Sequence, residues 1–398
     1  MVAVVIKPRY WRGLVVSTLA ICLPSNAAVL PEDRADALYH RYEGGGVTID
    51  GPSIQVRKQL GNRISVSGKY YVDSISSASI DVQTYASPYT EERTEKNASI
   101  DFLNEKTTVS LSYTNSDEND YEANTGAIAF SHDMFGDLTT LSIAYSLGMD
   151  DVFRTTALPE GGRDRDPDFA EEVTRYGYFI SLSQILTPSL IVSFNFDRVA
   201  EEGFLNNPYR QVRYLDSDPN NPDGFSFQFE NYKYPTTRTS RAAAIRAKYF
   251  LPYRASIGAE YRLYSDTWGI SASNYKLEYT HALVSGWIFD VRYRFYSQDQ
   301  ADFYSDLFPH ENAQNYMARD KELSTYTSTT FGLGVSYDIL RGGWGIFDKG
   351  SLNVAYDRIS FDYDNFRDIT NPEASDPGQE PLYSFDADVW QLYLSLWY

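Results

Sequence analysis

The chain ends with the eleven residues DVWQLYLSLWY, Asp388 to Tyr398, in which large apolar side chains recur at every second position. Successive strand side chains point to opposite faces, so an extended strand puts one such set on a single face: Trp390, Leu392, Leu394, Leu396 and Tyr398. At the end of a soluble protein these apolar side chains would be exposed to water, because chain termini fray. About eleven residues is instead the length of a tilted strand that crosses a bilayer. We therefore interpret this stretch as a membrane-insertion strand; the alternative is the last strand of a soluble β-protein.

The amino end of the chain has the three parts of a secretory signal peptide. Three basic residues come first: Lys7, Arg9 and Arg12. The apolar stretch 14–23 is too short to span a membrane, and small residues favour cleavage near Ala27 or Ala28. We predict that residues 1–28 are removed on export. Cys22, the only cysteine, lies inside this segment, so the mature chain would have no disulfide and no thiolate ligand for a metal.

Composition narrows the class of membrane protein. After residue 28 no run of eighteen or more apolar residues occurs, and the mean hydropathy is -0.42, which together exclude a helical membrane protein. Barrel strands alternate polar and apolar side chains, so a barrel is compatible with this polar average. The net charge of -19 argues against nucleic acid as a partner. The 33 tyrosines and 22 phenylalanines suit aromatic girdles at two membrane interfaces.

Alternating stretches recur along the whole chain and are joined by short and long connections in turn. The predicted strands are 36–44, 47–60, 63–73, 97–104, 107–116, 124–132, 137–147, 174–185, 190–199, 237–250, 254–266, 269–281, 286–298, 325–339, 350–363 and 387–398. The long connections are 74–96, 117–123, 148–173, 200–236, 299–324 and 364–386. Short periplasmic turns that alternate with long outer loops are the topology of an outer-membrane barrel. We predict an all-β fold, a transmembrane antiparallel β-barrel of about sixteen strands over residues 36–398, preceded by an exposed amino-terminal arm, 29–35.

One face of the predicted barrel wall is rich in ionisable residues. In the stretch 287–296 the odd positions are apolar or aromatic, and the even ones include Asp290, Arg292 and Arg294. Because a Lys or Arg costs roughly 2–4 kcal/mol on the lipid face near the bilayer midplane, the even positions must point into the lumen. The same parity on neighbouring strands gives nine inward residues: Arg246, Lys248, Glu260, Arg262, Lys276, Glu278, Asp290, Arg292 and Arg294.

These nine residues have two interpretations. As a charged constriction they would set the ion selectivity of a pore. As a ladder of cross-strand ion pairs, Arg246 or Lys248 with Glu260 and Glu278 with Arg292, they would only hold the wall together. The two interpretations are compatible, because a sixteen-strand barrel is wide enough for an aqueous channel. Both disfavour a dry, solid barrel.

No pattern in the sequence indicates catalysis, a cofactor or a specific metal site. The adjacent residues Ser131, His132 and Asp133 cannot form a nucleophile, base and orienting group among themselves, because consecutive strand residues face opposite sides. The acidic stretch 216–223 lacks the glycine and glutamate that an EF-hand needs. We interpret it, like the acidic run 117–122, as a solvated loop; a generic divalent-cation contact is the alternative. We expect neither an enzyme nor a cofactor.

Three stretches carry a resemblance to a known family: Leu30–Gly61 (LPEDRADALYHRYEGGGVTIDGPSIQVRKQLG), Ser67–Val82 (SGKYYVDSISSASIDV) and Asp302–Ile339 (DFYSDLFPHENAQNYMARDKELSTYTSTTFGLGVSYDI). They resemble the exported domain-of-unknown-function family 3570 over nearly all of the mature chain. The resemblance implies an outer-membrane barrel and no assigned activity. It also implies a link to small lipoproteins and flavin-attaching enzymes, whose genes often lie beside those of the family. The last strand is similar to the signal that bacterial barrel-assembly machinery recognises.

Three functions follow as hypotheses. The first is a porin-like channel in the outer membrane of a Gram-negative envelope, which passes small polar solutes or ions through a charged lumen. The second is a sleeve or scaffold for an envelope lipoprotein or redox partner. The third, an outer-membrane hydrolase, lacks a credible site. In each case we expect contact with outer-membrane lipid and lipopolysaccharide and with the barrel-assembly machinery.

Overall fold

The computed structural model describes residues 29–77, 89–158, 163–221, 223–229, 233–370 and 376–398. These residues form strands and their connections, with one short 3-10 helix, η1 (Lys321–Leu323). No helix in the described part of the chain is long and apolar enough to cross a membrane. The predicted signal peptide, 1–28, and its cleavage site lie outside the described residues.

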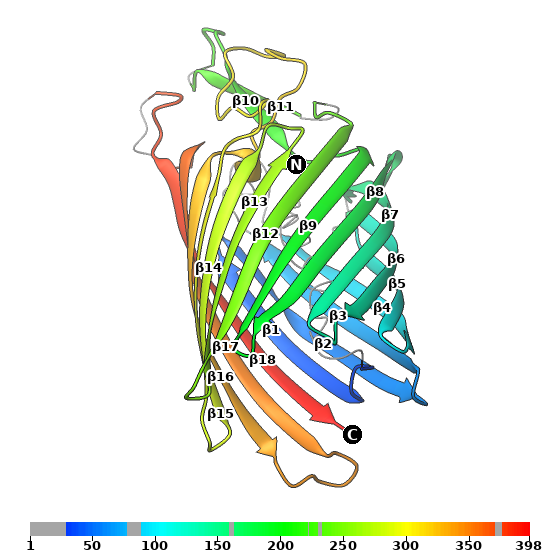
Figure 1. Cartoon of the computed structure of the whole chain (residues 1–398). Helices are drawn as coiled ribbons and strands as arrows, with labels where there is room; N and C mark the ends of the chain where they lie inside the picture. Colours follow the sequence, from blue (N-terminus) through cyan, green and yellow to red (C-terminus); the bar gives the residue numbers. More distant parts are fainter. Residues whose placement is uncertain (1–28, 78–88, 159–162, 222, 230–232, 371–375) are drawn as a thin grey trace.

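Sixteen strands form one closed antiparallel barrel (Figure 1). Barrel neighbours follow one another along the chain, except that β9 pairs with β12, and β1 pairs with β18 to close the ring. The barrel strands are β1 (Arg34–Gly44), β2 (Val47–Leu60), β3 (Ile64–Ser77), β4 (Tyr89–Asn104), β5 (Thr107–Glu118), β6 (Tyr121–Met134), β7 (Thr139–Ala157), β8 (Arg163–Thr187), β9 (Leu190–Gly203), β12 (Thr237–Leu251), β13 (Ala255–Asp266), β14 (Ser271–Ala282), β15 (Trp287–Gln298), β16 (Tyr326–Leu340), β17 (Lys349–Arg367) and β18 (Leu382–Trp397). The predicted fold class and the number of about sixteen strands are confirmed.

The two ends of the barrel differ in the length of their connections. The end where β1 begins and β18 finishes has short turns, such as 105–106 and 188–189. The other end carries the long connections 204–236, 299–325 and 368–381. We call these the periplasmic and outer ends, because outer-membrane barrels place short turns in the periplasm and long loops outside.

Two of the predicted long outer loops, 117–123 and 148–173, are wrong. The structure joins β5 and β6 by the tight turn 119–120 and continues β7 and β8 as strands as far as the connection 158–162. These segments are acidic and lack regular alternation, because they extend beyond the membrane and no lipid excludes charge from their outer face. The backbone ladder continues there, since its hydrogen bonds do not depend on the polarity of the side chains.

The predicted exposed arm, 29–35, is partly built into the barrel. β1 begins at Arg34, and Leu30 is buried. The Asp33 carboxylate accepts a hydrogen bond from the backbone N–H of Gln59, near the periplasmic end of β2. This contact holds the arm against the wall.

The outer surface of the wall carries an apolar band. Ile245 and Leu277 are 53% and 54% exposed, although each belongs to a well-paired strand. Four residues of the predicted membrane-insertion strand lie on the same outward side of β18: Trp390, Leu392, Leu394 and Leu396. Tyr398 follows this strand, and its hydroxyl donates to the carbonyl oxygen of Arg57 at 2.9 Å. Exposed apolar side chains at alternate positions of a closed barrel mean that its outer face meets lipid.

Candidate functional site

The inner surface of β12 to β15 carries the nine ionisable residues predicted for the wall. Ile245, Leu263, Leu277 and Val291 are exposed on the outer face of these strands, so the residues that alternate with them point into the lumen. The nine inward residues are Arg246, Lys248, Glu260, Arg262, Lys276, Glu278, Asp290, Arg292 and Arg294. They bring six cationic and three acidic side chains to one side of the barrel.

Two ion pairs join β13 to the strands on one side of it. Arg246 Nε donates to Glu260 Oε2 at 2.6 Å, between directly paired positions of β12 and β13. The Arg262 guanidinium pairs with Asp197 of β9 at 3.1 Å. This second pair crosses β12, where the inward residues between them are alanines. The first pair, between neighbouring strands, is one that the sequence predicts. The second connects two strands that lie on either side of β12.

The partner of Arg292 differs from the prediction. Arg292 and Glu278 are register partners on β15 and β14, but the guanidinium turns the other way and pairs with Asp357 on β17, with 2.9 Å between Nη2 and Oδ1. It crosses β16 at Gly332 and Gly334, which have no side chain in the way. A Cβ on Gly332 would lie 2.0 Å from Asp357 Oδ1 and 3.0 Å from Arg292 Nε. The predicted pair Glu278–Arg292 is therefore wrong, because two glycines open a route to a different carboxylate.

Two cations of this wall have no ion pair among the described residues: Lys248 and Arg294. The Arg294 guanidinium lies over the ring of Tyr296, 5.2 Å from its centroid. Asp290 has a neutral partner, because the hydroxyl of Thr280 donates to its carboxylate at 2.6 Å. Within the described residues these three groups form no ion pair, although Arg294 also interacts electrostatically with Glu260.

The inner wall is accessible to solvent. The side chains of Arg246, Lys276 and Glu278 are 39%, 36% and 42% exposed, although they point into the barrel. Lys276 and Glu278 also pair with each other along β14. An inward side chain can be solvent-accessible only where the lumen has space beside it. This part of the wall therefore lines an aqueous lumen and is not a packed core.

The outer mouth of the barrel is occupied by two of its own connections, 204–236 and 299–325, which we call the outer cap. The first includes a small hairpin of β10 (Gln211–Leu215) and β11 (Phe225–Phe229), seen above the barrel in Figure 1. One buried apolar cluster joins the cap to distant strands of the ring; its members include Tyr121 of β6, Phe169 of β8, Leu205, Phe303, Leu323 and Tyr363 of β17. Since β6 and β17 lie far apart in the ring, this cluster crosses the mouth.

Hydrogen bonds fasten the cap to the wall and its two segments to each other. The Tyr209 hydroxyl, fully buried, accepts from the backbone N–H of Thr155 on β7 at 2.6 Å. The backbone N–H of Met317 donates to the carbonyl of Lys233 at 2.9 Å, which links the two segments. The cap is therefore an ordered part of the fold at these contacts.

A buried ion-pair network ties the cap to the connection 368–381. Arg213 is 0% exposed and donates from Nη1 to Glu380 Oε1 at 2.6 Å. Asp306 lies between Arg213 and Arg319, with Nη2 contacts of 3.5 and 2.9 Å. Burial works to raise the pKa of the Glu380 carboxyl, but hydrogen bonds, above all from Arg213, outweigh it and hold that pKa below its ordinary value. Glu380 is thus held as a carboxylate by the arginine that it binds.

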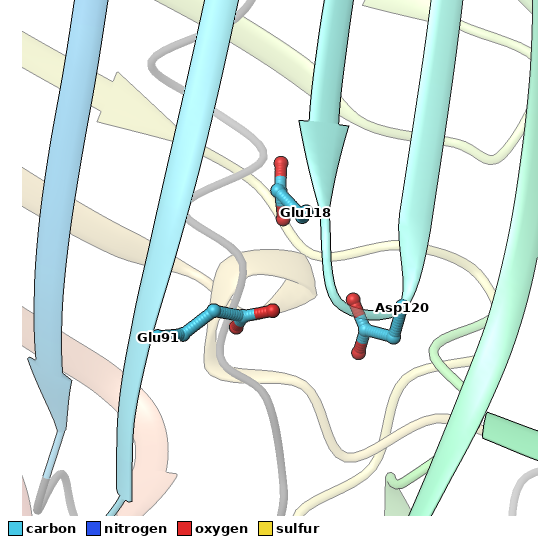
Figure 2. Close-up of side chains that lie close together, drawn as sticks. All are labelled: Glu91, Glu118 and Asp120. Atoms are coloured by element: carbon cyan, nitrogen blue, oxygen red, sulfur yellow. The ribbon is translucent and has the colours of Figure 1, made fainter. Parts of the chain in front are cut away.

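Three buried carboxylates meet near the outer turn of β5 and β6. Figure 2 shows Glu91, Glu118 and Asp120 gathered around one point, and one carboxylate oxygen of each residue lies within 4.8 Å of the other two. Arg93, two residues from Glu91 on β4, interacts electrostatically with Glu118. Oxygen ligands in this number suit a divalent cation, but the neighbouring guanidinium also supplies positive charge, so we assign no ion here. The sequence does not predict this group, because Glu118 and Asp120 belong to an acidic run that is typical of a solvated loop.

A second buried polar group lies on the inner face of β1, β3 and β4. His40 Nε2 lies 2.8 Å from Asp73 Oδ1, and Arg93 pairs with the same carboxylate. The ring of Tyr71 stacks on His40 at 5.1 Å between centroids. Both partners of the histidine reach the same ring nitrogen, so the arrangement lacks the two-sided relay that a catalytic histidine uses.

Comparison with known proteins identifies a family. The family model described as protein of unknown function DUF3570 matches residues 80–346. No curated protein matches the sequence.

Three solved structures are similar to this chain. A bacterial polysaccharide outer membrane secretin is 7% identical, with a TM-score of 0.48 and coverage of 92% of this chain and 99% of that chain. A loop L8 deletion mutant of OmpT, an outer membrane protein of Vibrio cholerae, is 8% identical, with a TM-score of 0.43 and coverage of 92% and 99%. A FadL homologue of Pseudomonas aeruginosa is 10% identical, with a TM-score of 0.40 and coverage of 95% and 93%.

Proposed function

This chain belongs to the family of proteins of unknown function DUF3570, and we propose that it is a porin-like channel of the outer membrane for small polar solutes or ions. Export with cleavage near Ala27 or Ala28 is part of this proposal. The observation that carries it is the inner wall of β12 to β15, where charged side chains are solvent-accessible inside a closed barrel. Charges that face an aqueous lumen cost little and act on any ion that passes.

The cations without ion pairs have the strongest influence on a passing ion. At a distance, the two charges of an ion pair nearly cancel, whereas Lys248 and Arg294 belong to no such pair among the described residues. This side of the lumen should therefore attract small anions.

The outer cap restricts the route. Packed and buried side chains cross the mouth from β6 to β17, so a solute can pass only beside them or after they move. We expect a low conductance for the resting protein and a higher one when the cap is loosened.

Planar-bilayer recording of the refolded protein tests the proposal, with the reversal potential taken across a KCl gradient. We expect stable current steps, and we expect Arg294→Gln to shift the reversal potential toward cations because a positive charge is removed from the wall. The matched control is the double variant Arg246→Gln with Glu260→Gln, which removes an ion pair at no change in net charge and should stay near the wild-type value.

A folded barrel that carries no current, with and without its cap, would contradict the channel. The second candidate, a sleeve for an envelope lipoprotein or redox partner, would then be favoured. Co-isolation from native membranes would identify what the barrel holds.

A further inference from the structure

Two arginines face outward, away from the lumen, on neighbouring strands of the wall. Arg198 of β9 and Arg241 of β12 are direct register partners, and both are exposed. They share the outer face with Phe194 and Ile245, which lie four residues away on the same strands and are themselves exposed. Neither arginine has an ion pair with any residue that the structure describes.

Within the described part of the chain, the outward residues next to this pair carry no negative charge. The register places Tyr178 beside Arg198 and Ser265 beside Arg241 on the outer face. Arg241 Nε donates to the Ser265 hydroxyl at 3.1 Å. The next outward residues along the two strands are uncharged: Phe196, Ala200, Thr239 and Ala243. Like charges directly opposite each other destabilise a sheet, so a bound anion would stabilise this one.

The pair lies at the outer edge of the apolar band. Between it and the periplasmic end, β9 presents four apolar residues to the outside: Leu190, Val192, Phe194 and Phe196. Eight residues of a strand tilted by about 40° cover roughly 20 Å along the bilayer normal, which is close to the height of the lipid-facing band. The guanidiniums therefore lie at the level of the outer-leaflet headgroups, where basic side chains reach lipid phosphates.

Two other outward arginines, on the opposite side of the ring, are neutralised by the protein itself. Arg41 of β1 pairs with Glu43 at 3.0 Å, and Arg358 of β17 pairs with Asp386 at 2.8 Å. Carboxylates are abundant in a chain with a net charge of -19. A pair of cations that none of them approaches, within the described residues, is therefore a local feature of β9 and β12.

We propose that Arg198 and Arg241 together bind a phosphate of an outer-leaflet glycolipid, the phosphorylated sugar headgroup of lipopolysaccharide. Two guanidiniums present parallel N–H donors that match the oxygens of one phosphate. The ring of Tyr178 and the hydroxyl of Ser265 flank the arginines, and such groups suit the sugar to which the phosphate is attached. The assignment rests on the outer-membrane location proposed above and is independent of channel activity.

Native mass spectrometry of the purified full-length barrel in detergent, titrated with lipopolysaccharide, tests this assignment. We expect the wild type to keep one tightly bound lipid. The double variant Arg198→Gln with Arg241→Gln should bind it more weakly, by about tenfold for each charge-assisted hydrogen bond that it can no longer donate to the phosphate. The matched control, Arg41→Gln with Arg358→Gln, also removes two outward arginines, but these already have acidic partners, so its affinity should equal that of the wild type.

Two further probes separate the possible sources of the anion. Lipopolysaccharide stripped of its phosphates should bind the wild type no better than it binds the double variant. Equimolar inorganic phosphate should not displace the intact lipid, because it lacks the sugar and the acyl chains. Equal binding of intact and stripped lipid, equal affinity of the wild type and the double variant, or displacement by equimolar inorganic phosphate would each overturn the proposal. Conductance does not enter these readouts, so a failure of the channel would be distinguishable from a failure of this site.

Discussion

At the scale of single residues, two glycines decide which partner the lumen-facing Arg292 takes. Because β16 has glycine at positions 332 and 334, the guanidinium can lie across that strand and reach Asp357. A methyl group on Gly332 would lie 2.0 Å from the carboxylate oxygen, so one of the two charged side chains must move. We expect Gly332→Ala to lower the free energy of unfolding by about 1–2 kcal/mol, since it separates a part-buried ion pair, and urea titration in vesicles measures this.

A strand glycine with open space beside it provides the control for that prediction. Gly126 on β6 has nothing within 4 Å of an added Cβ, so Gly126→Ala should not destabilise the barrel. Equal decreases in unfolding free energy for the two alanine variants would mean that the ion pair across β16 contributes no stability.

A second residue, Glu380, makes the outer cap sensitive to acid. The folded-state pKa of its carboxyl lies below the ordinary value of 4.5, because the hydrogen bonds from Arg213 outweigh the effect of burial. The stabilisation is therefore fully present above about pH 4.5 and is lost as the pH falls through the lowered pKa. We expect the connections 204–236 and 368–381 to become more readily cleaved by pepsin as the pH falls below 4.5 and through the lowered pKa of Glu380, while the barrel strands stay resistant.

The variant Glu380→Gln identifies the group responsible for this acid response. It cannot form the charge-assisted hydrogen bond at any pH, so its cap should be cleaved at a rate that depends less on pH than that of the wild type. An unchanged pH profile in the variant would place the acid-sensitive group elsewhere in the cap.

At the scale of elements, the two faces of β18 should respond oppositely to the same charge. Leu392 points to lipid between Trp390 and Leu394, whereas Gln391 points inward. An arginine near the middle of the lipid face costs about 2–4 kcal/mol, and an arginine that faces an aqueous lumen costs little. Leu392→Arg should therefore destabilise the folded barrel by about that amount, and Gln391→Arg should not, as measured by urea unfolding in phospholipid vesicles. Similar destabilisation by both would mean that β18 does not have one lipid face and one aqueous face.

The same two-sided environment explains which elements the sequence could predict. Between the two membrane interfaces, contact with lipid requires an apolar residue at every second position, so the alternation of strands such as β2 and β15 is visible in the sequence. Outside the membrane this requirement is absent, and the sequences of the outer extensions of β7 and β8 therefore resemble acidic loops. The hairpin of β10 and β11 was missed for a related reason, since it packs within the cap and has no lipid face.

The alternation of inward and outward positions along a strand has the same limit at the candidate site. It predicted that Arg292 lies on the inner face of β15, because a charge on the lipid face is too costly. It could not predict Asp357 as the partner, because that contact depends on the position of a strand beyond the neighbouring one. The role of the nine wall residues in ion selectivity stays a prediction.

At the scale of the whole molecule, the barrel combines an aqueous inner wall with a packed outer mouth. The wall side chains Arg246 and Glu278 are accessible to solvent, whereas Tyr209 and Arg213 of the cap are fully buried. The sequence showed only that 200–236 and 299–324 are long and irregular. Whether such loops fold inward depends on contacts between segments far apart in the chain, and local periodicity carries no information about them.

The last prediction concerns the cap as a unit. Replacing residues 302–323 by a short glycine-serine turn removes Phe303, Arg319 and η1 from the mouth but leaves the ladder between β15 and β16 intact. Because the packed cluster would then no longer cross the barrel, we expect the single-channel conductance to rise several-fold while the heat-shifted gel mobility of a folded barrel is kept.

Arg213→Gln, which loosens the cap without shortening it, should give intermediate and noisier currents. Shortening the periplasmic connection 341–348 provides the control, since it lies at the opposite end and should leave the conductance unchanged. If the shortened cap left the current of a folded barrel at the wild-type level, the cap would not be what restricts the channel, and the narrowest point would have to lie at the charged wall itself.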